Sequence, residues 1–146
     1  MDRLTKEYKR LVRDSWRFFY LSHRTWAKAI EDMGLSAGTY SSLEMIVQNP
    51  GVTQQDISDE LSIDKSCTSR ACKYLETNGF IYREKSPDCT HGFKCYPTEK
   101  AIEVCEKVIG IEKVHIHALF ADIDTGELET ASAMMDKLIE KLKGQQ

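Results

Sequence analysis

Residues 52–100, VTQQDISDELSIDKSCTSRACKYLETNGFIYREKSPDCTHGFKCYPTEK, decide the fold of this chain. They contain two short helix-forming runs that meet at a tight turn, and two strand-like runs that follow at once. Thr53 is a good N-cap, and Asp56 lies where the acid of a capping box belongs. This order of elements predicts a winged helix-turn-helix, in which the second helix is free to enter a groove of DNA.

The second helix of this pair is predicted to span residues 65–78. Ser62 and Ile63 form the turn before it, with Ile63 expected to face the core, and Asp64 is expected to cap the helix. Gly79 ends it, because glycine tolerates the left-handed backbone conformation that closes many helices.

The second helix has two chemically different faces. Small or apolar side chains, among them Thr68, Cys72 and Leu75, recur at helical spacing and are expected to pack on the first helix. The opposite face carries basic and hydroxyl groups and no acid. Because a wing follows this helix, DNA recognition is favoured over a solvated face that is basic by chance. The residues expected to contact DNA from this face are Lys65, Ser66, Ser69, Arg70 and Lys73.

Two strand-like runs, residues 80–85 and 93–97, are separated by a turn and predict the hairpin of the wing. The cationic side chains expected to contact DNA from this hairpin are Lys85, His91 and Lys94.

The net charge of −3 does not argue against DNA binding, because the charge is unevenly distributed. Residues 65–94 carry six basic and three acidic residues, whereas residues 34–64 carry five acidic residues and no basic one. Charges interact with phosphates mainly within a Debye length of about 8–10 Å. The local excess of positive charge on the second helix and the wing is therefore what matters for binding.

Composition narrows the class of protein. No run of about 18 apolar residues occurs, so no membrane span is predicted, and the N-terminus MDRLTKEYKR lacks the apolar segment of a signal peptide. Five cysteines, an odd number, fit reduced thiols better than a disulfide framework. A cytoplasmic protein is therefore expected. The chain has no P-loop, GxSxG, HExxH or dinucleotide-binding motif, so neither an enzyme nor a bound cofactor is expected.

Apolar stripes at helical spacing flank the winged region on both sides. The first stripe, which ends before Gly34, is too long to be buried on a small winged domain alone. A homodimer built from the terminal helices of two chains is therefore expected. The alternative is a monomer whose terminal helices fold back on their own domain. The expected fold is mainly α (an α+β winged helix), divided into residues 1–34 (dimerisation), 35–98 (DNA binding) and 99–146 (dimerisation).

The motifs NPGVTQQDISDELSIDKSCTSR (49–70), LETNGFIYREKSPD (75–88) and TEK (98–100) resemble the pattern of the MarR (multiple antibiotic resistance) transcriptional regulators. The resemblance covers most of the chain and implies a winged-helix homodimer on a pseudo-palindromic DNA site, usually a repressor. Many such regulators release DNA when a small, often aromatic, ligand binds or when a cysteine is oxidised. The positions that match the family's reading helix are the five predicted DNA contacts on the second helix.

The wing departs from the family pattern, in which Asp-x-Arg places an arginine in the minor groove. Here Asp88-Cys89-Thr90 contains no arginine, and Pro97 stands where an apolar residue usually precedes TEK. A neutral His91 is attracted to a narrow, negative groove less than arginine is. We therefore expect weaker anchoring of the wing, and an affinity that rises as the pH falls through the titration range of histidine.

Aromatic side chains near the N-terminus suggest a ligand cavity between the dimerisation and DNA-binding parts, and the resemblance supports one. Ordinary core and interface packing is the alternative explanation for each of them. The residues assigned to this cavity are Trp16, Phe19, His23, Trp26 and Tyr40.

The cysteines suggest a redox alternative. Cys67 lies near the start of the second helix beside Lys65, a setting that favours the thiolate. Cys89 and Cys95 flank the wing tip, where oxidation would reshape the DNA-binding surface. Cys89, His91 and Cys95 also have a spacing seen among metal ligands, but without a fourth ligand no metal site is assigned.

A winged helix can also bind a partner protein through the same surface. The alternative to DNA binding is therefore a protein-interaction module. The basic, acid-free face of the second helix favours DNA over a protein partner.

Overall fold

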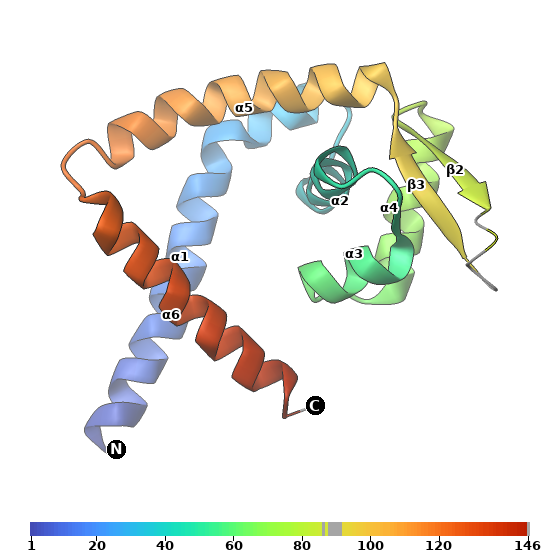
Figure 1. Cartoon of the computed structure of the whole chain (residues 1–146). Helices are drawn as coiled ribbons and strands as arrows, with labels where there is room; N and C mark the ends of the chain where they lie inside the picture. The colour runs from blue at the N-terminus through green and yellow to red at the C-terminus, as the bar shows by residue number, and fades with distance from the viewer. Residues whose placement is uncertain (86, 88–91, 146) are drawn as a thin grey trace. The chain divides into compact units, whose positions relative to one another are not determined.

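The computed structural model describes residues 1–85, 87 and 92–145, and in them the chain is mainly helical with one small sheet (Figure 1). The helices are α1 (Arg3–Asp32), α2 (Ala37–Gln48), α3 (Gln54–Leu61), α4 (Lys65–Thr77), α5 (Glu99–Leu119) and α6 (Thr125–Lys143). The strands are β1 (Val52–Thr53), β2 (Ile81–Lys85) and β3 (Phe93–Pro97). This order confirms the predicted winged helix-turn-helix with long helices on either side.

The chain forms two compact units, Met1–Glu112 and Lys113–Gln146, so the division between them falls inside α5. The first unit contains α1 to α4, the whole sheet and most of α5, and it carries the candidate DNA-binding surface. Among the residues that the structure describes, no helix is long and apolar enough to cross a membrane.

The start of α3 is the predicted capping box. The Thr53 hydroxyl accepts a hydrogen bond from the Asp56 backbone N–H at 3.1 Å, and the Asp56 carboxylate accepts one from the Thr53 backbone N–H at 2.8 Å. The backbone N–H groups of Thr53 and Asp56, which have no partner within the helix, are thereby satisfied. The Asp56 carboxylate also accepts a hydrogen bond from the Thr53 hydroxyl at 2.7 Å, and the two hydrogen bonds that Thr53 donates to it hold the pKa of the Asp56 carboxyl below its usual value.

The turn between α3 and α4 differs from the prediction, because Ile63 does not face the core. Ser62 adopts a left-handed conformation with φ of 52°, and Leu61 packs against the core instead of Ile63, which is 36% exposed. Asp64 occupies the N-cap position of α4 as predicted, but its side chain makes no capping hydrogen bond. The two helices are instead joined by a hydrogen bond of 2.8 Å between the buried hydroxyls of Ser58 and Thr68.

The end of α4 is a Schellman motif at the predicted glycine. Gly79 has φ of +72°, its N–H donates to the Glu76 carbonyl at 3.1 Å, and the Phe80 N–H donates to the Leu75 carbonyl at 2.9 Å. This closure leads the chain directly from α4 into β2, so the geometry of one turn fixes where the wing begins.

The sheet is antiparallel with the strand order β1-β3-β2. The predicted hairpin is present, and Arg83 of β2 faces Cys95 of β3. On the other edge of β3, Val52 of β1 also pairs with Cys95. The sequence did not indicate β1, because a strand of two residues has no periodicity of its own.

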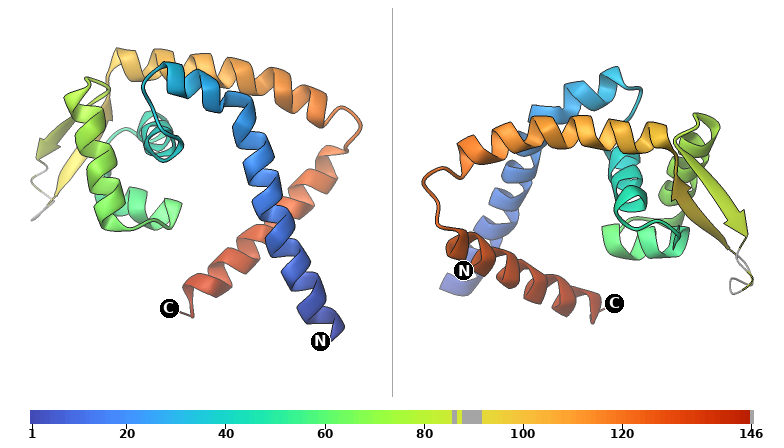
Figure 2. Two further views of the ribbon diagram at one scale, coloured as in Figure 1. Left: turned by 180° about the vertical axis from the view of Figure 1, so that it is seen from behind. Right: turned by 45° about the horizontal axis from the view of Figure 1, so that its top comes forward.

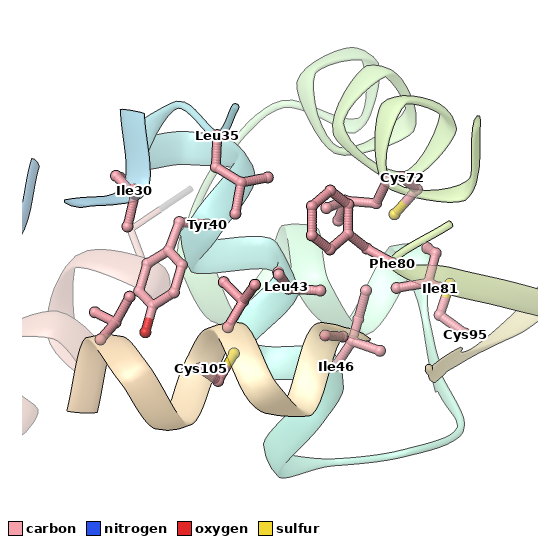
Figure 3. Close-up of a cluster of buried hydrophobic side chains, with 14 of the residues drawn as sticks. Ile30, Leu35, Tyr40, Leu43, Ile46, Cys72, Phe80, Ile81, Cys95 and Cys105 are labelled. Carbon is pink, nitrogen blue, oxygen red and sulfur yellow. The ribbon is translucent and has the colours of Figure 1, made fainter. Parts of the chain in front are cut away.

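The core of the first unit is formed by the end of α1, by α2, α3, α4 and α5, and by the sheet (Figure 3). Leu43 and Ile46 of α2, Ile57 of α3, Leu75 of α4 and Val108 of α5 are each 0% exposed. Because the inner face of α4 is fixed in this core, its opposite face is held at the surface.

We expect Thr53→Ala to lower the free energy of unfolding by about 1 kcal/mol, because it removes an N-cap side chain. Since the folded pKa of Asp56 is depressed, its stabilising effect is present above the unfolded pKa and disappears as the pH falls through the folded value. The variant should therefore lose less stability on acidification than the parent. Urea unfolding at neutral and acidic pH measures both effects, with Thr77→Ala at the exposed end of α4 as the control. Equal pH dependence in the two proteins would contradict this role of the capping box.

Candidate nucleic-acid interface

The outer face of α4 presents all five side chains that the sequence assigns to DNA. The inner face is buried through Thr68, Cys72 and Leu75. The outer face, which we call the basic face, consists of Lys65, Ser66, Ser69, Arg70 and Lys73, and each of these residues is exposed. Arg70 donates one hydrogen bond, from Nη2 to the Cys67 sulfur at 3.3 Å, which leaves most of its guanidinium donors available for a ligand.

Long-range contacts hold α4 in place behind the basic face. The Tyr74 hydroxyl donates to the backbone carbonyl of Gly34 in the connection between α1 and α2. At the far end of α4, Lys100 Nζ donates to the Asn78 carbonyl at 2.8 Å and lies 4.1 Å from the centre of the Phe80 ring. These contacts fix both the position and the direction of α4. A helix that docks into a DNA groove needs both to be fixed.

The wing is attached to α4 by an ion pair that sequence reasoning missed. Arg83 of β2 donates from Nε to the Glu76 carboxylate of α4 at 3.0 Å, and its guanidinium lies 5.3 Å from the centre of the Phe93 ring. The pairing lowers the pKa of Glu76 and raises that of Arg83. Arg83 therefore orients the wing against α4. Both views of Figure 2 show α4 beside the hairpin.

Two of the predicted wing cations lie on the hairpin that follows α4. Lys85 is exposed at the end of β2, and Lys94 of β3 is half-buried opposite Glu84. His91 lies outside the described residues. The described part of the wing therefore carries two of the predicted cations, one of which faces an acid across the hairpin.

The aromatic residues assigned to a ligand cavity are only partly brought together. The His23 ring lies 4.5 Å from Trp26, Trp26 lies 5.5 Å from Tyr40, and Phe19 is 5.9 Å from His23. Phe19 and Trp16 are exposed at 57% and 66%, so they lie on the surface of this chain. Within the described residues, His23 Nε2 and the Tyr40 hydroxyl are buried without a hydrogen-bond partner.

The cysteines occupy different environments. Cys67 is exposed on α4, whereas Cys95 is buried in β3 beside the buried Cys72 of α4 (Figure 3). The Cys72 thiol donates to the Cys95 sulfur, which lowers the pKa of Cys95 and raises that of Cys72. Cys89 lies outside the described residues. In the part of the chain that is described, no cluster of three His, Cys, Asp or Glu side chains is arranged for a metal ion.

A pair of packed helices with a hairpin directly after the second is the architecture of winged helix-turn-helix proteins. A sequence model of the MarR family matches residues 35–88, from the start of α2 to the wing.

Two bacterial relatives described as HTH-type transcriptional regulators agree with this class. The HTH-type transcriptional regulator BilQ of Clostridioides difficile is 30% identical over 104 residues, 69% of this chain and 70% of that protein. YybA of Bacillus subtilis, described as an uncharacterized HTH-type transcriptional regulator, is 28% identical over 108 residues, 74% of this chain and 72% of the relative. A MarR family regulator from Listeria monocytogenes, whose structure was solved with a 26mer DNA, has the same fold. The two structures align with a TM-score of 0.81 and 23% sequence identity, and the alignment covers 90% of this chain and 87% of the Listeria chain. The chain belongs to the MarR family of winged helix-turn-helix transcriptional regulators, so it is a regulator and not an enzyme.

Proposed function

We propose that this protein binds a pseudo-palindromic site on double-stranded DNA as a homodimer, and represses transcription from that site until a small effector binds. The observation that carries the proposal is the basic face of α4, which is exposed, contains no acid and is held rigidly beside a wing. The presence of DNA in the related Listeria structure supports the same partner here.

The chemistry of the basic face matches a major groove. Arg70 would bond a guanine edge through its planar fork, while Lys65 and Lys73 would neutralise phosphates. Ser66 and Ser69 would bond bases or the DNA backbone. From the wing, Lys85, His91 and Lys94 would contact the DNA backbone or the minor groove.

Unburied apolar surface on the terminal helices supports the homodimer. A single chain rarely exposes so many large apolar side chains unless they contact a partner. No residue of α6 is buried. The exposed apolar residues include Leu4, Tyr8, Leu11, Val12, Trp16, Phe18, Phe19, Tyr20 and Leu21 on α1, and Leu128, Met134, Met135, Ile139 and Leu142 on α6. In this proposal residues 1–34 and 99–146 form the dimer, and residues 35–98 bind DNA.

We expect sedimentation at micromolar concentration to give a mass close to twice 16.7 kDa. Introducing a charge into the apolar surface, as in Leu128→Glu, should shift the equilibrium to the monomer, whereas the same charge in Thr77→Glu, at the exposed end of α4 outside the proposed dimer segments, should not. A monomeric parent protein under these conditions would contradict the dimer.

The effector is proposed to bind near the aromatic residues His23, Trp26 and Tyr40, because the buried His23 Nε2 and Tyr40 hydroxyl have no hydrogen-bond partner among the residues that the structure describes. A ligand there would contact α1 and α2, and α2 packs on α4. Effector binding can therefore alter the position of the basic face.

Selection of duplexes from a random library with the purified protein tests the proposal. We expect a two-fold symmetric consensus whose half-sites are one helical turn, about 34–36 Å, apart. Failure to enrich any duplex at low ionic strength would overturn DNA binding and favour the protein-interaction module instead.

A further inference from the structure

A hydrogen bond links the proposed DNA-reading helix directly to the end of α1. The Tyr74 hydroxyl of α4 donates to the backbone carbonyl of Gly34, which lies 40 residues earlier in the chain. Both residues belong to the compact unit Met1–Glu112. A Cβ atom at residue 34 would lie 3.5 Å from the Tyr74 hydroxyl, so the connection after α1 and the end of this side chain are in close contact. Tyr74 is outside the basic face and is not one of the proposed DNA contacts.

The Gly34 carbonyl is held in a fixed position at the end of α1. Gly34 has φ of +78°, and its N–H donates to the Glu31 carbonyl at 2.9 Å. The Leu35 N–H donates to the Ile30 carbonyl, also at 2.9 Å, which completes a Schellman motif. Ile30 and Leu35 are 2% and 3% exposed, so both are anchored in the core. The acceptor for Tyr74 therefore cannot move unless the end of α1 moves with it.

Tyr74 lies at the border between the two faces of α4. Side chains three and four residues apart are neighbours on the surface of a helix. Tyr74 therefore lies beside Arg70, which is exposed on the basic face, and beside Ala71, which is half-buried. The Tyr74 side chain is itself 40% exposed. Its hydrogen bond thus holds α4 from the side, next to the arginine that is proposed to recognise a base.

Two directional contacts hold α4 on different sides of its buried inner face. Glu76 is paired with Arg83 of β2, whereas Tyr74 is bonded to Gly34. Residues two apart on a helix do not face the same side, so the two contacts oppose each other. The inner face is held mainly by apolar contacts, which have no preferred direction and resist rotation of α4 about its axis less than hydrogen bonds do. Loss of the Tyr74 hydrogen bond therefore frees α4 to rotate.

A small rotation of α4 is enough to matter for base recognition. Side chains end about 5–6 Å from the helix axis, so a rotation of about 10° moves them by about 1 Å. A hydrogen bond to a base edge needs a donor–acceptor distance of about 2.7–3.2 Å. Contacts with phosphates depend on charge over a Debye length of about 8–10 Å and tolerate such a shift. The rotation of α4 therefore affects sequence recognition more than non-specific binding.

We propose that Tyr74 is a positioning residue for sequence recognition: its hydrogen bond to Gly34 sets the rotation of α4 at which Arg70 meets a base edge. Tyr74 itself contacts no base in this proposal. The inference rests on the proposed DNA binding and deepens it, because Gly34 closes the helix that is assigned to dimerisation. The end of the dimerisation helix thereby fixes the geometry of the reading helix in the same chain.

Tyr74→Phe removes the hydroxyl and keeps the ring. The affinity of this variant is measured for the selected duplex and for a duplex of unrelated sequence, over a range of salt concentrations. We expect the affinity for the selected duplex to fall about three- to tenfold, because losing a hydrogen bond lowers the fraction of molecules in the reading orientation by about that factor. The affinity for the unrelated duplex and the salt slope should change less than about twofold, because no charge is removed.

A second background separates positioning from a general loss of structure. If Tyr74 acts through Arg70, Tyr74→Phe should cost less than about twofold in an Arg70→Ala protein, since residues that act through one contact are not additive. A role in folding alone would cost the same factor in both backgrounds. The matched control is Tyr82→Phe, which removes the hydroxyl of a tyrosine that is 47% exposed on β2 and should leave both affinities unchanged.

Hydrogen exchange of the free protein tests the same bond without DNA. We expect the amides of α4 to exchange up to about tenfold faster in Tyr74→Phe than in the parent, because a less firmly held helix opens locally more often. The amides of α5 should exchange at the parent rate. A global loss of stability would instead raise exchange in every helix.

Three results would overturn the proposal: an unchanged preference of folded Tyr74→Phe for the selected duplex, equal losses on the selected and unrelated duplexes, or unchanged protection of α4 in the free protein. If the parent enriches no duplex, the proposed function fails, and the exchange measurement still shows whether Tyr74 restrains α4. If the parent enriches a duplex and Tyr74→Phe binds it equally well, DNA binding stands and the role of Tyr74 fails.

Discussion

Arg70→Ala is expected to weaken binding to the selected duplex by about 1–3 kcal/mol, roughly a five- to 150-fold loss of affinity. Arg70 lies in the middle of the basic face, and a single hydrogen bond to Cys67 is the only one that it donates among described residues. Its removal therefore takes away the proposed DNA contact and leaves no buried group without a partner among the described residues.

Arg70→Lys distinguishes base reading from simple charge. Lysine keeps the charge but lacks the planar fork that bonds both acceptors of a guanine edge. An intermediate affinity, with relaxed preference at one base position, would indicate base reading by Arg70. Lys107→Ala, which removes a charge from the exposed surface of α5, serves as the control. If a folded Arg70→Ala protein binds the duplex as tightly as the parent protein, Arg70 does not recognise a base.

Leu75→Ala is expected to lower the free energy of unfolding by about 2–5 kcal/mol. Leu75 is 0% exposed on the inner face of α4, so the smaller side chain leaves a cavity between α4 and the rest of the core. The loss is large compared with the total stability of a typical domain, about 5–15 kcal/mol. DNA binding should fail together with folding, because the core holds the basic face in position.

Equilibrium unfolding in urea at a fixed protein concentration measures this effect, since the stability of a dimer depends on concentration. Ile63→Ala is the matched control, because Ile63 is partly exposed in the turn before α4. We expect it to cost much less than Leu75→Ala. Similar losses for the two variants would show that the inner face of α4 does not anchor the helix.

The sequence predicted the features that depend on short-range chemistry. The capping box at Thr53 and the positive φ at Gly79 fix where α3 begins and where α4 ends, and both follow from residues no more than five positions apart. The two faces of α4 follow in the same way from helical periodicity. The residues of the basic face therefore follow from the sequence alone.

The features that the sequence did not predict depend on partners distant in the chain. Strand β1 exists because Val52 pairs with Cys95, and Cys95 meets Cys72 because the wing packs on α4. Arg83 looks like an available wing cation until its pairing with Glu76 is seen.

The salt dependence of DNA binding by a variant of the basic face tests the central claim most directly. In Lys65→Ala/Arg70→Ala/Lys73→Ala the fold should persist, because all three side chains are exposed. We expect a large loss of affinity and a shallower slope of log affinity against log salt, by about 0.9 for each phosphate contact removed. A folded triple variant with the affinity and salt slope of the parent would contradict the claim that this face of α4 binds DNA.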